Sequence, residues 1–326
     1  MAIANSERLF VSILREVCAE LGIRMQTYHG GWVLTLRKGA RTEHIYGYDF
    51  SLNSAAAQQI AKDKAATFSI LAEAGVPAIE HQLVMSPILP DYVPENGNWV
   101  RLRRLFGRWN RDVVCKPNDG TGGRDIFRAQ SLVQLERAIH VILAKGRACA
   151  ISPYVAVKDE YRVVMQNGQP LLLYRKVRPH VVGDGRRPFV DLLADWIGSA
   201  ESNHQALKTK LKTLGRMETD ARMLHRVPKV GEVIPVNWQH NLGQGASPVE
   251  MNPRVGQGQE LVALANKTMN AMQLRVASVD MVVASPGKPQ VLEVNSGIMM
   301  EQFAATSRQK AVAVYWSILN ALFVES

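Results

Sequence analysis

Apolar and polar residues alternate most regularly near the end of the chain, in residues 276–295. Two segments rich in Val flank the turn signal Ser285-Pro286-Gly287-Lys288, in which Pro presets φ and Gly accepts a positive φ. This pattern predicts a β-hairpin with strands over 276–284 and 290–295. Because side chains alternate along a strand, the two faces of this hairpin carry different residues.

One face of the predicted hairpin is acidic and polar. A loop that is symmetric about Pro286-Gly287 places Asp280 directly opposite Glu293. The same register places Ser278 opposite Asn295 on the same face. The other face is apolar and is expected in the core, with Val279, Met281, Leu292 and Val294.

Two carboxylates that face each other across a strand pair repel each other. A cation between them removes this repulsion, and Mg²⁺ prefers one or two carboxylates together with phosphate oxygens and waters. We therefore interpret Asp280, Glu293 and Asn295 as candidate metal ligands. The alternative interpretation is a solvated outer face, but it does not explain why the polar residues are short acids and an amide.

Helical spacing and turn signals predict the other elements. The long stretch 54–74 reads as one helix that carries Lys64, which we expect to face solvent. The remaining predicted helices cover 5–21, 131–144, 189–197, 205–214, 218–224, 261–272 and 308–323, and two further hairpins are predicted in 32–46 and 161–174.

A short apolar strand over 112–117 runs directly into a glycine-rich loop. The strand ends with Lys116, and the loop contains Gly120, Gly122 and Gly123. Backbone amides in such a loop can approach phosphate oxygens closely, and the lysine adds a positive charge. The spacing is neither that of a P-loop nor that of a dinucleotide-binding turn. A second glycine-bearing loop includes Asn241.

The charge balance favours an anionic ligand. The 326 residues carry a net charge of +10 and have a pI near 9.6, which suits a nucleotide, an acidic substrate or a nucleic acid. The arginine-rich segment 101–111 could suit RNA, but we interpret it as a basic surface segment and do not expect a nucleic-acid partner.

The chain shows neither a membrane span nor a signal peptide at its start. Its three cysteines form no metal-binding or disulfide pattern. We therefore expect a cytoplasmic protein, and leave open whether it forms a homo-oligomer.

Five segments occur in the order found in the ATP-grasp ligases, which the chain resembles over roughly residues 55–310. The resemblance is to the ATP-grasp portions of cyanophycin synthetases and fused bacterial glutathione synthetases, and to the ribosomal-protein-modifying glutamate ligases. The segments are DKAATFSILAEAGVP at 63–77, VVCKPNDGTGGRDI at 113–126, ISPYVAVKDEYRVV at 151–164, WQHNLGQGAS at 238–247, and SVDMVV with VLEVN within 278–295.

The resemblance implies an α+β fold in which two lobes clasp ATP. It implies a short N-terminal α/β segment (1–53), a first ATP-grasp lobe (54–152) and a second lobe (153–326) that contains the metal-binding hairpin and a helical insertion near 199–228. The implied cofactors are ATP and two Mg²⁺ ions, with Mn²⁺ as an alternative metal.

The resemblance also assigns roles to residues. Lys64 and Lys116 would contact the phosphates, which the loop with Gly120, Gly122 and Gly123 would cover. Glu160 would hold the ribose, and the adenine would meet the hinge of Pro153, Tyr154 and Val155. Arg162, Lys176 and Asn241 would act on the reacting groups, and Asp280, Glu293 and Asn295 would hold the metal.

The implied activity is an ATP-dependent carboxylate–amine ligase. A carboxylate would attack the γ-phosphorus of ATP, and an amine would then attack the acyl phosphate to form an amide. The substrates would be small molecules, namely an amino acid or a peptide with an amine. A kinase of the same fold and a nucleotide-binding protein without turnover are the alternatives.

Overall fold

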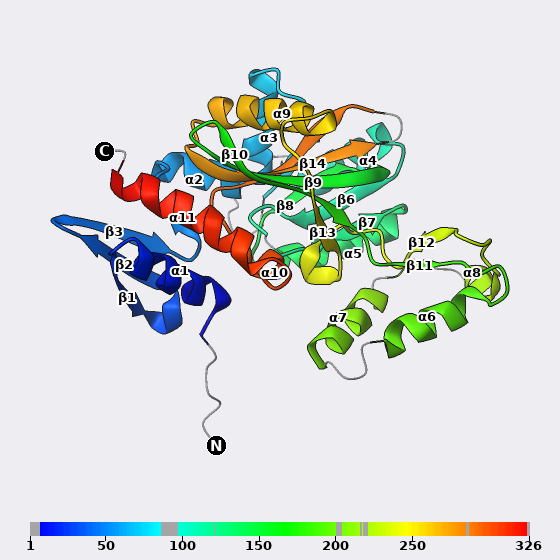
Figure 1. Ribbon diagram of the computed structural model, residues 1–326. Helices are drawn as coiled ribbons and strands as arrows, with labels where there is room; N and C mark the ends of the chain where they lie inside the picture. The colour runs from blue at the N-terminus through cyan, green and yellow to red at the C-terminus, as the bar shows by residue number, and fades with distance from the viewer. Residues whose placement is uncertain are drawn as a thin grey trace. The chain divides into compact units, whose positions relative to one another are not determined.

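The computed structural model describes residues 7–85, 97–120, 122–199, 204–215, 217, 221–284 and 287–324 (Figure 1). These residues form two compact units. The first unit combines Met1–Tyr174 with Glu250–Ser326, and the second is Arg175–Val249. The predicted boundaries after residues 53 and 152 stay predictions.

The chain begins with a helix on a small antiparallel sheet. Helix α1 (Leu9–Glu20) buries one apolar stripe, and Gly22 follows it with a positive φ of 66°. The predicted hairpin in 32–46 is confirmed, because Lys38 pairs with Arg41. Two flanking strands were not predicted. The sheet order is β1 (Arg24–Tyr28), β2 (Val33–Lys38), β3 (Arg41–Tyr46) and β4 (Asp49–Phe50).

A second four-stranded sheet carries Lys116. Its order is β5 (Gln82–Val84), β8 (Cys149–Pro153), β6 (Val113–Pro117) and β7 (Phe127–Ala129). Helices α4 (Gly97–Arg108) and α5 (Leu132–Leu143) pack their apolar side chains on the face that carries Cys115 and Ile151. Because side chains alternate, Lys116 points to the opposite face.

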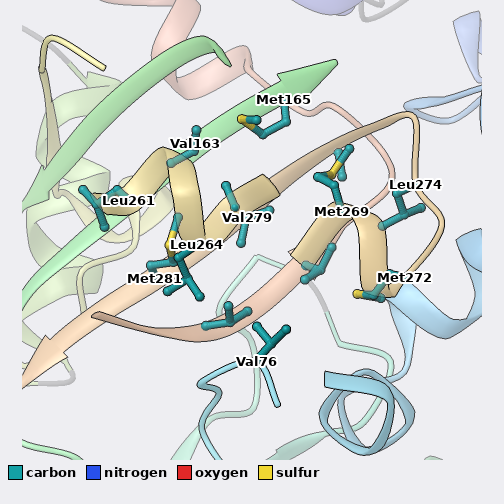
Figure 2. Close-up of a cluster of buried hydrophobic side chains, with 14 of the residues drawn as sticks. Val76, Val163, Met165, Leu261, Leu264, Met269, Met272, Leu274, Val279 and Met281 are labelled. Atoms are coloured by element: carbon teal, nitrogen blue, oxygen red, sulfur yellow. The ribbon is translucent and has the colours of Figure 1, made fainter. Parts of the chain in front are cut away.

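The largest sheet contains the predicted hairpin. Strands β10 (Gln169–Val177), β9 (Val157–Gln166), β14 (Val276–Ala284) and β15 (Pro289–Asn295) are neighbours in that order. Helix α9 (Gln257–Ala271) packs Leu261, Leu264 and Met269 against Val163, Val279 and Met281 of this sheet (Figure 2). This apolar face leaves the other face of β9, β14 and β15 for polar side chains.

The predicted hairpin register is confirmed at the two acids, but it shifts by one residue between them and the turn. Asp280 pairs with Glu293 and Ser278 with Asn295, but Met281 pairs with Val291 instead of Leu292. The extra residue is a β-bulge. Val291 is therefore buried in place of the half-buried Leu292, which corrects the expectation that Leu292 lies in the core. Ser285 and Pro286 of the predicted turn lie outside the described residues.

The predicted helix over 54–74 is wrong in one respect, because it is two helices. Helix α2 (Ala55–Lys62) ends at Asp63, whose ψ of 111° is extended, and α3 (Lys64–Glu73) begins immediately afterwards. The Asp63 side chain accepts a hydrogen bond of 2.7 Å from the Ala66 amide. This is an N-cap, and it competes with helix continuation at Asp63.

The chain ends with α10 (Glu301–Ala304) and α11 (Arg308–Val324). Tyr315 of α11 lies with its ring centroid 5.3 Å from that of Phe10 in α1, and its hydroxyl donates to the Ile298 carbonyl. None of the described helices has the length and apolar character that crossing a membrane requires.

The second unit is mainly helical. Strand β11 (His180–Val182) pairs with β12 (Val233–Pro235), and helix α6 (Phe189–Gly198) packs on this pair. Helices α7 (His204–Leu214) and α8 (Ala221–His225) lie within the stretch where the helical insertion was predicted. A 3₁₀ turn (Leu242–Gln244) precedes β13 (Ser247–Glu250), by which the chain leaves the unit.

The cap at Asp63 yields the first prediction. We expect Asp63→Ala to lower the free energy of unfolding by about 1 kcal/mol, because the first turn of α3 loses its acceptor. Asp63→Asn keeps an acceptor and should stay close to the wild type. Urea unfolding followed by circular dichroism measures the difference, and equal stability of all three proteins would contradict the cap.

Candidate functional site

Three neighbouring strands bring charged side chains into one row. Asp280 in the middle strand β14 pairs with Arg162 of β9 on one side and with Glu293 of β15 on the other. The predicted juxtaposition of the two acids is thus confirmed. The row places one guanidinium and two carboxylates next to one another on the polar face of the sheet.

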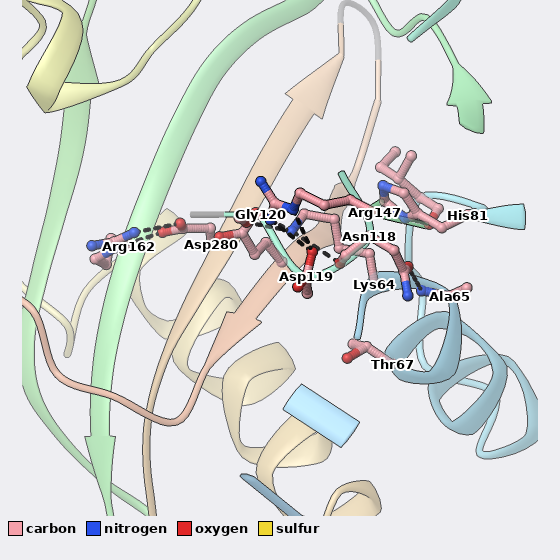
Figure 3. A network of polar contacts seen from close by, with 12 residues as sticks. Lys64, Ala65, Thr67, His81, Asn118, Asp119, Gly120, Arg147, Arg162 and Asp280 are labelled. Carbon is pink, nitrogen blue, oxygen red and sulfur yellow. Dashed lines mark hydrogen bonds and ion pairs between the residues drawn. The ribbon is translucent and has the colours of Figure 1, made fainter. Parts of the chain in front are cut away.

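Arg162 binds Asp280 directly with two hydrogen bonds. Arg162 Nε lies 2.7 Å from Asp280 Oδ1, and Nη2 lies 2.6 Å from Oδ2 (Figure 3). The exposed fractions of the two side chains are 17% and 5%. Burial disfavours the guanidinium charge, but Asp280, Tyr174 and Glu293 together raise the pKa of Arg162 well above its usual value. Arg162 is therefore charged, and the pair is mostly buried.

Lys64 approaches the second acid from the start of α3. Its Nζ lies 3.8 Å from Glu293 Oε2 and donates a 2.7 Å hydrogen bond to the Gly120 carbonyl. The expectation that Lys64 faces solvent is wrong, because the break at Asp63 turns the first residue of α3 inward and buries it. Lys64 therefore links the acidic hairpin to the glycine-rich loop.

Lys116 is the second buried lysine of the site. Burial, followed by the nearby positive charge of Lys64, lowers its pKa to about 8. Glu293 and Glu160 act in the opposite direction. The structure therefore brings Lys64, Lys116, Glu160 and Glu293 close enough to influence one another. Two buried lysines that influence each other electrostatically favour an anionic ligand nearby.

Asn118 was not predicted, although it holds the start of α3 in place. Its backbone carbonyl accepts from the Lys64 amide at 3.2 Å, and its Oδ1 accepts from the Ala65 amide at 3.1 Å. These bonds occupy the first amides of α3, so the helix N-terminus is satisfied by protein atoms. An Asn immediately after the strand is the only sequence signal, and it is a weak one.

The glycine-rich loop has the backbone that its sequence predicts. Gly122 and Gly123 adopt φ values of 70° and 68°, a region that disfavours other residues. A Cβ on Gly120 would lie 3.0 Å from the Pro117 side chain. The loop is tied down by an ion pair of 2.7 Å between Asp119 and Arg147. Thr121 lies outside the described residues.

The predicted hinge begins with the last residue of β8, Pro153. Pro153 pairs with Val113, and the Tyr154 amide donates to the Asp112 carbonyl at 2.9 Å. The Arg128 guanidinium lies 3.5 Å from the centre of the Tyr154 ring. These contacts fix the backbone of Pro153 and Tyr154 beside β6, and Val155 follows. Their predicted role toward adenine stays a prediction.

Two predicted catalytic residues belong to the second unit. Lys176 lies near the end of β10, and Asn241 accepts a 2.8 Å hydrogen bond from the Gly243 amide at the start of the 3₁₀ turn. The first unit alone therefore assembles Lys64, Lys116, Glu160, Arg162, Asp280 and Glu293.

Two buried polar atoms near this site have no hydrogen-bond partner among the described residues. One is Nδ2 of Asn295, and the other is Nε2 of His81. The His81 Nδ1 donates to the Ile79 carbonyl at 2.9 Å, so Nε2 is an acceptor, and burial followed by Lys116 lowers the pKa of the ring. His81 carried no sequence signal.

The donor set fits a divalent cation that is also held by phosphate oxygens. No group of three or more His, Cys, Asp or Glu side chains in the described part of the chain could hold a metal alone. Asp280 and Glu293 supply two opposed carboxylates, which is the number that Mg²⁺ takes when phosphates complete its coordination. The unpartnered Nδ2 of Asn295 next to them is a hydrogen-bond donor, which fits an acceptor such as a phosphate oxygen, whereas only its Oδ1 could bind the cation.

Known proteins resemble this chain over most of its length. No family model matches the chain. The chain is 24% identical over 279 residues to the cyanophycin synthetase of Trichormus variabilis. This alignment covers 81% of the chain and 29% of the cyanophycin synthetase. The chain thus spans about three tenths of the length of this relative.

Two solved structures share the fold. The bifunctional glutathione synthetase of Pasteurella multocida has a TM-score of 0.51 at 20% identity, covering 91% of this chain and 41% of that one. The D-alanine–D-alanine ligase of Bacillus anthracis has a TM-score of 0.50 at 13% identity, covering 83% and 71%. The chain therefore has the predicted α+β ATP-grasp fold.

Proposed function

We propose that the chain is an ATP-dependent carboxylate–amine ligase that joins an amino acid or peptide to an amine. One observation carries the proposal. Two buried lysines, Lys64 and Lys116, surround the same site as the opposed carboxylates of Asp280 and Glu293. Similarity to the amide-forming ligases named above supports the choice of reaction.

The charges of the site are suited to a triphosphate with its metal. Lys64 and Lys116 would bind phosphate oxygens, and Asp280, Glu293 and Asn295 would hold Mg²⁺, with two ions as the proposed number. The metal would neutralise part of the negative charge of the phosphates. The loop with Gly120, Gly122 and Gly123 would cover the phosphates and exclude water, which would otherwise hydrolyse an acyl phosphate.

In the proposed reaction a substrate carboxylate oxygen attacks the γ-phosphorus of ATP, and ADP leaves. The amine nitrogen then attacks the carbonyl carbon, phosphate leaves, and the amine loses a proton. The protein positions the reactants and balances charge without forming a covalent bond to them. Arg162, Lys176 and Asn241 are the proposed residues for the reacting groups.

The remaining predicted roles are part of the same proposal. Glu160 would hold the ribose, and the backbone of Pro153, Tyr154 and Val155 would meet the adenine. The described cysteines are free and buried, which supports the cytoplasm as the proposed compartment. The homo-oligomer and the absence of a nucleic-acid partner stay predictions.

Product analysis tests the proposed function directly. Pairs of amino acids, dipeptides and amines are incubated with ATP and Mg²⁺, and ADP, phosphate and the coupled product are measured by mass spectrometry. A ligase releases phosphate and forms the amide only when acid and amine are both present. A phosphorylated alcohol would instead identify a kinase, and nucleotide binding without any product would identify a binding protein.

The metal assignment yields a prediction for Glu293. We expect Glu293→Gln to abolish Mg²⁺-dependent turnover while the far-ultraviolet circular dichroism stays unchanged, because the substitution removes one of two opposed ligand charges and retains the shape. Glu16→Gln changes an exposed acid that pairs with Arg308 and should keep wild-type turnover. A Glu293→Gln variant with the wild-type rate would refute the metal site.

The lowered pKa of Lys116 predicts a pH dependence of nucleotide binding. Only the protonated lysine attracts phosphate, so raising the pH from 7 to 9, through a pKa of about 8, should weaken ADP binding about tenfold. Lys116→Arg stays charged over this range and should remove most of the dependence. Calorimetric titration measures both, and the same slope in the two proteins would contradict the assignment.

A further inference from the structure

Each acid of the hairpin already has a positive partner. Arg162 holds both oxygens of Asp280 at 2.6–2.7 Å from the β9 side, and Lys64 lies 3.8 Å from Glu293. The two cations come from different elements, since Arg162 lies on β9 and Lys64 begins α3 (Figure 3). The acids are therefore neutralised by the protein's own side chains.

The same four groups have a second way to balance their charges. A divalent cation between Asp280 and Glu293 would neutralise both carboxylates and remove the need for Arg162 and Lys64 there. Arg162 and Lys64 would then need other anions, because an unpaired buried charge is strongly unfavourable. Phosphate or carboxylate groups of a ligand are such anions.

We propose that Arg162 and Lys64 are displaceable counter-ions, which leave Asp280 and Glu293 when metal and nucleotide enter together. This inference rests on the proposed function, since it assumes a metal–nucleotide ligand. Metal alone meets carboxylates that are already neutralised, and nucleotide alone meets a lysine that is already paired. Each therefore binds weakly without the other, and the site favours their joint entry.

The two ion pairs differ in strength, and this difference sets which cation leaves its carboxylate first. Arg162 and Asp280 share two short hydrogen bonds in a mostly buried setting, whereas Lys64 and Glu293 are 3.8 Å apart and Lys64 donates mainly to the Gly120 carbonyl. Lys64 is thus the easier of the two to release. Arg162 is the main obstacle to binding of metal alone.

Mn²⁺ binding to the nucleotide-free protein tests the exchange without relying on turnover. Free Mn²⁺ is measured by electron paramagnetic resonance in titrations of the full chain, with and without ADP. We expect Arg162→Gln to bind Mn²⁺ alone at least tenfold more tightly than the wild type, because Asp280 loses the guanidinium that holds both of its oxygens. The gain in Mn²⁺ affinity on adding ADP should shrink in this variant.

Three matched variants sharpen the test. Arg162→Lys keeps the charge but loses the two-pronged contact, and should fall between wild type and Arg162→Gln. The double change of Arg162→Gln with Asp280→Asn should lose the gained affinity. Arg308→Gln, which breaks the exposed pair with Glu16, should leave Mn²⁺ binding unchanged.

Wild-type or weaker Mn²⁺ affinity in folded Arg162→Gln would overturn the proposal and identify a permanent clamp between β9 and β14. If that variant does not fold, the same titrations of the wild type decide. The proposed exchange requires that ADP tightens Mn²⁺ binding to the protein and that Mn²⁺ tightens ADP binding. Both effects must exceed what the affinity of Mn²⁺ for ADP in solution explains. Absence of any ADP binding would instead refute the proposed function, while the Mn²⁺ titration would still report on Arg162 and Asp280.

Discussion

The polar face of the large sheet depends on a balance of four charges. Asp280 and Glu293 face each other in adjacent strands, which would be repulsive if nothing compensated them. Arg162 compensates one acid from β9, and Lys64 compensates the other from α3. The charge balance therefore depends on the register of β9, β14 and β15 and on the position of the first residue of α3. A shift of any of these elements would separate a charge from the partner described here.

The position of Lys64 follows from the break between α2 and α3. A continuous helix would place Lys64 in a helix interior, but Asp63 caps a new helix and makes Lys64 its first residue. Asn118 then accepts from the first two amides of that helix, and Lys64 Nζ reaches the Gly120 carbonyl. One short side chain at Asp63 thus connects the helix, the glycine-rich loop and the acidic hairpin.

The sequence alone predicted those parts of the site that depend on local pattern. Strand alternation identified Asp280 opposite Glu293, and the glycines after Lys116 identified the loop. It did not predict the bulge at Leu292, because the choice between Val291 and Leu292 depends on which of two similar apolar side chains the core accepts. Nor could spacing show that Arg162 binds Asp280, since the two residues lie 118 positions apart.

The residues assembled in the first unit balance charge, and they do so independently of which substrates are joined. In the proposed function, the contribution of Lys64, Lys116, Asp280 and Glu293 would be charge balance toward a triphosphate with its metal, which is common to all acids and amines. Arg162 could offer the fork of Nε and Nη2 to a substrate carboxylate only after it leaves Asp280, because these two nitrogens are engaged there. If the proposed exchange takes place, selection of the acid would be coupled to occupancy of the proposed metal site. An acid that arrives before the metal would meet an arginine that is already paired with Asp280.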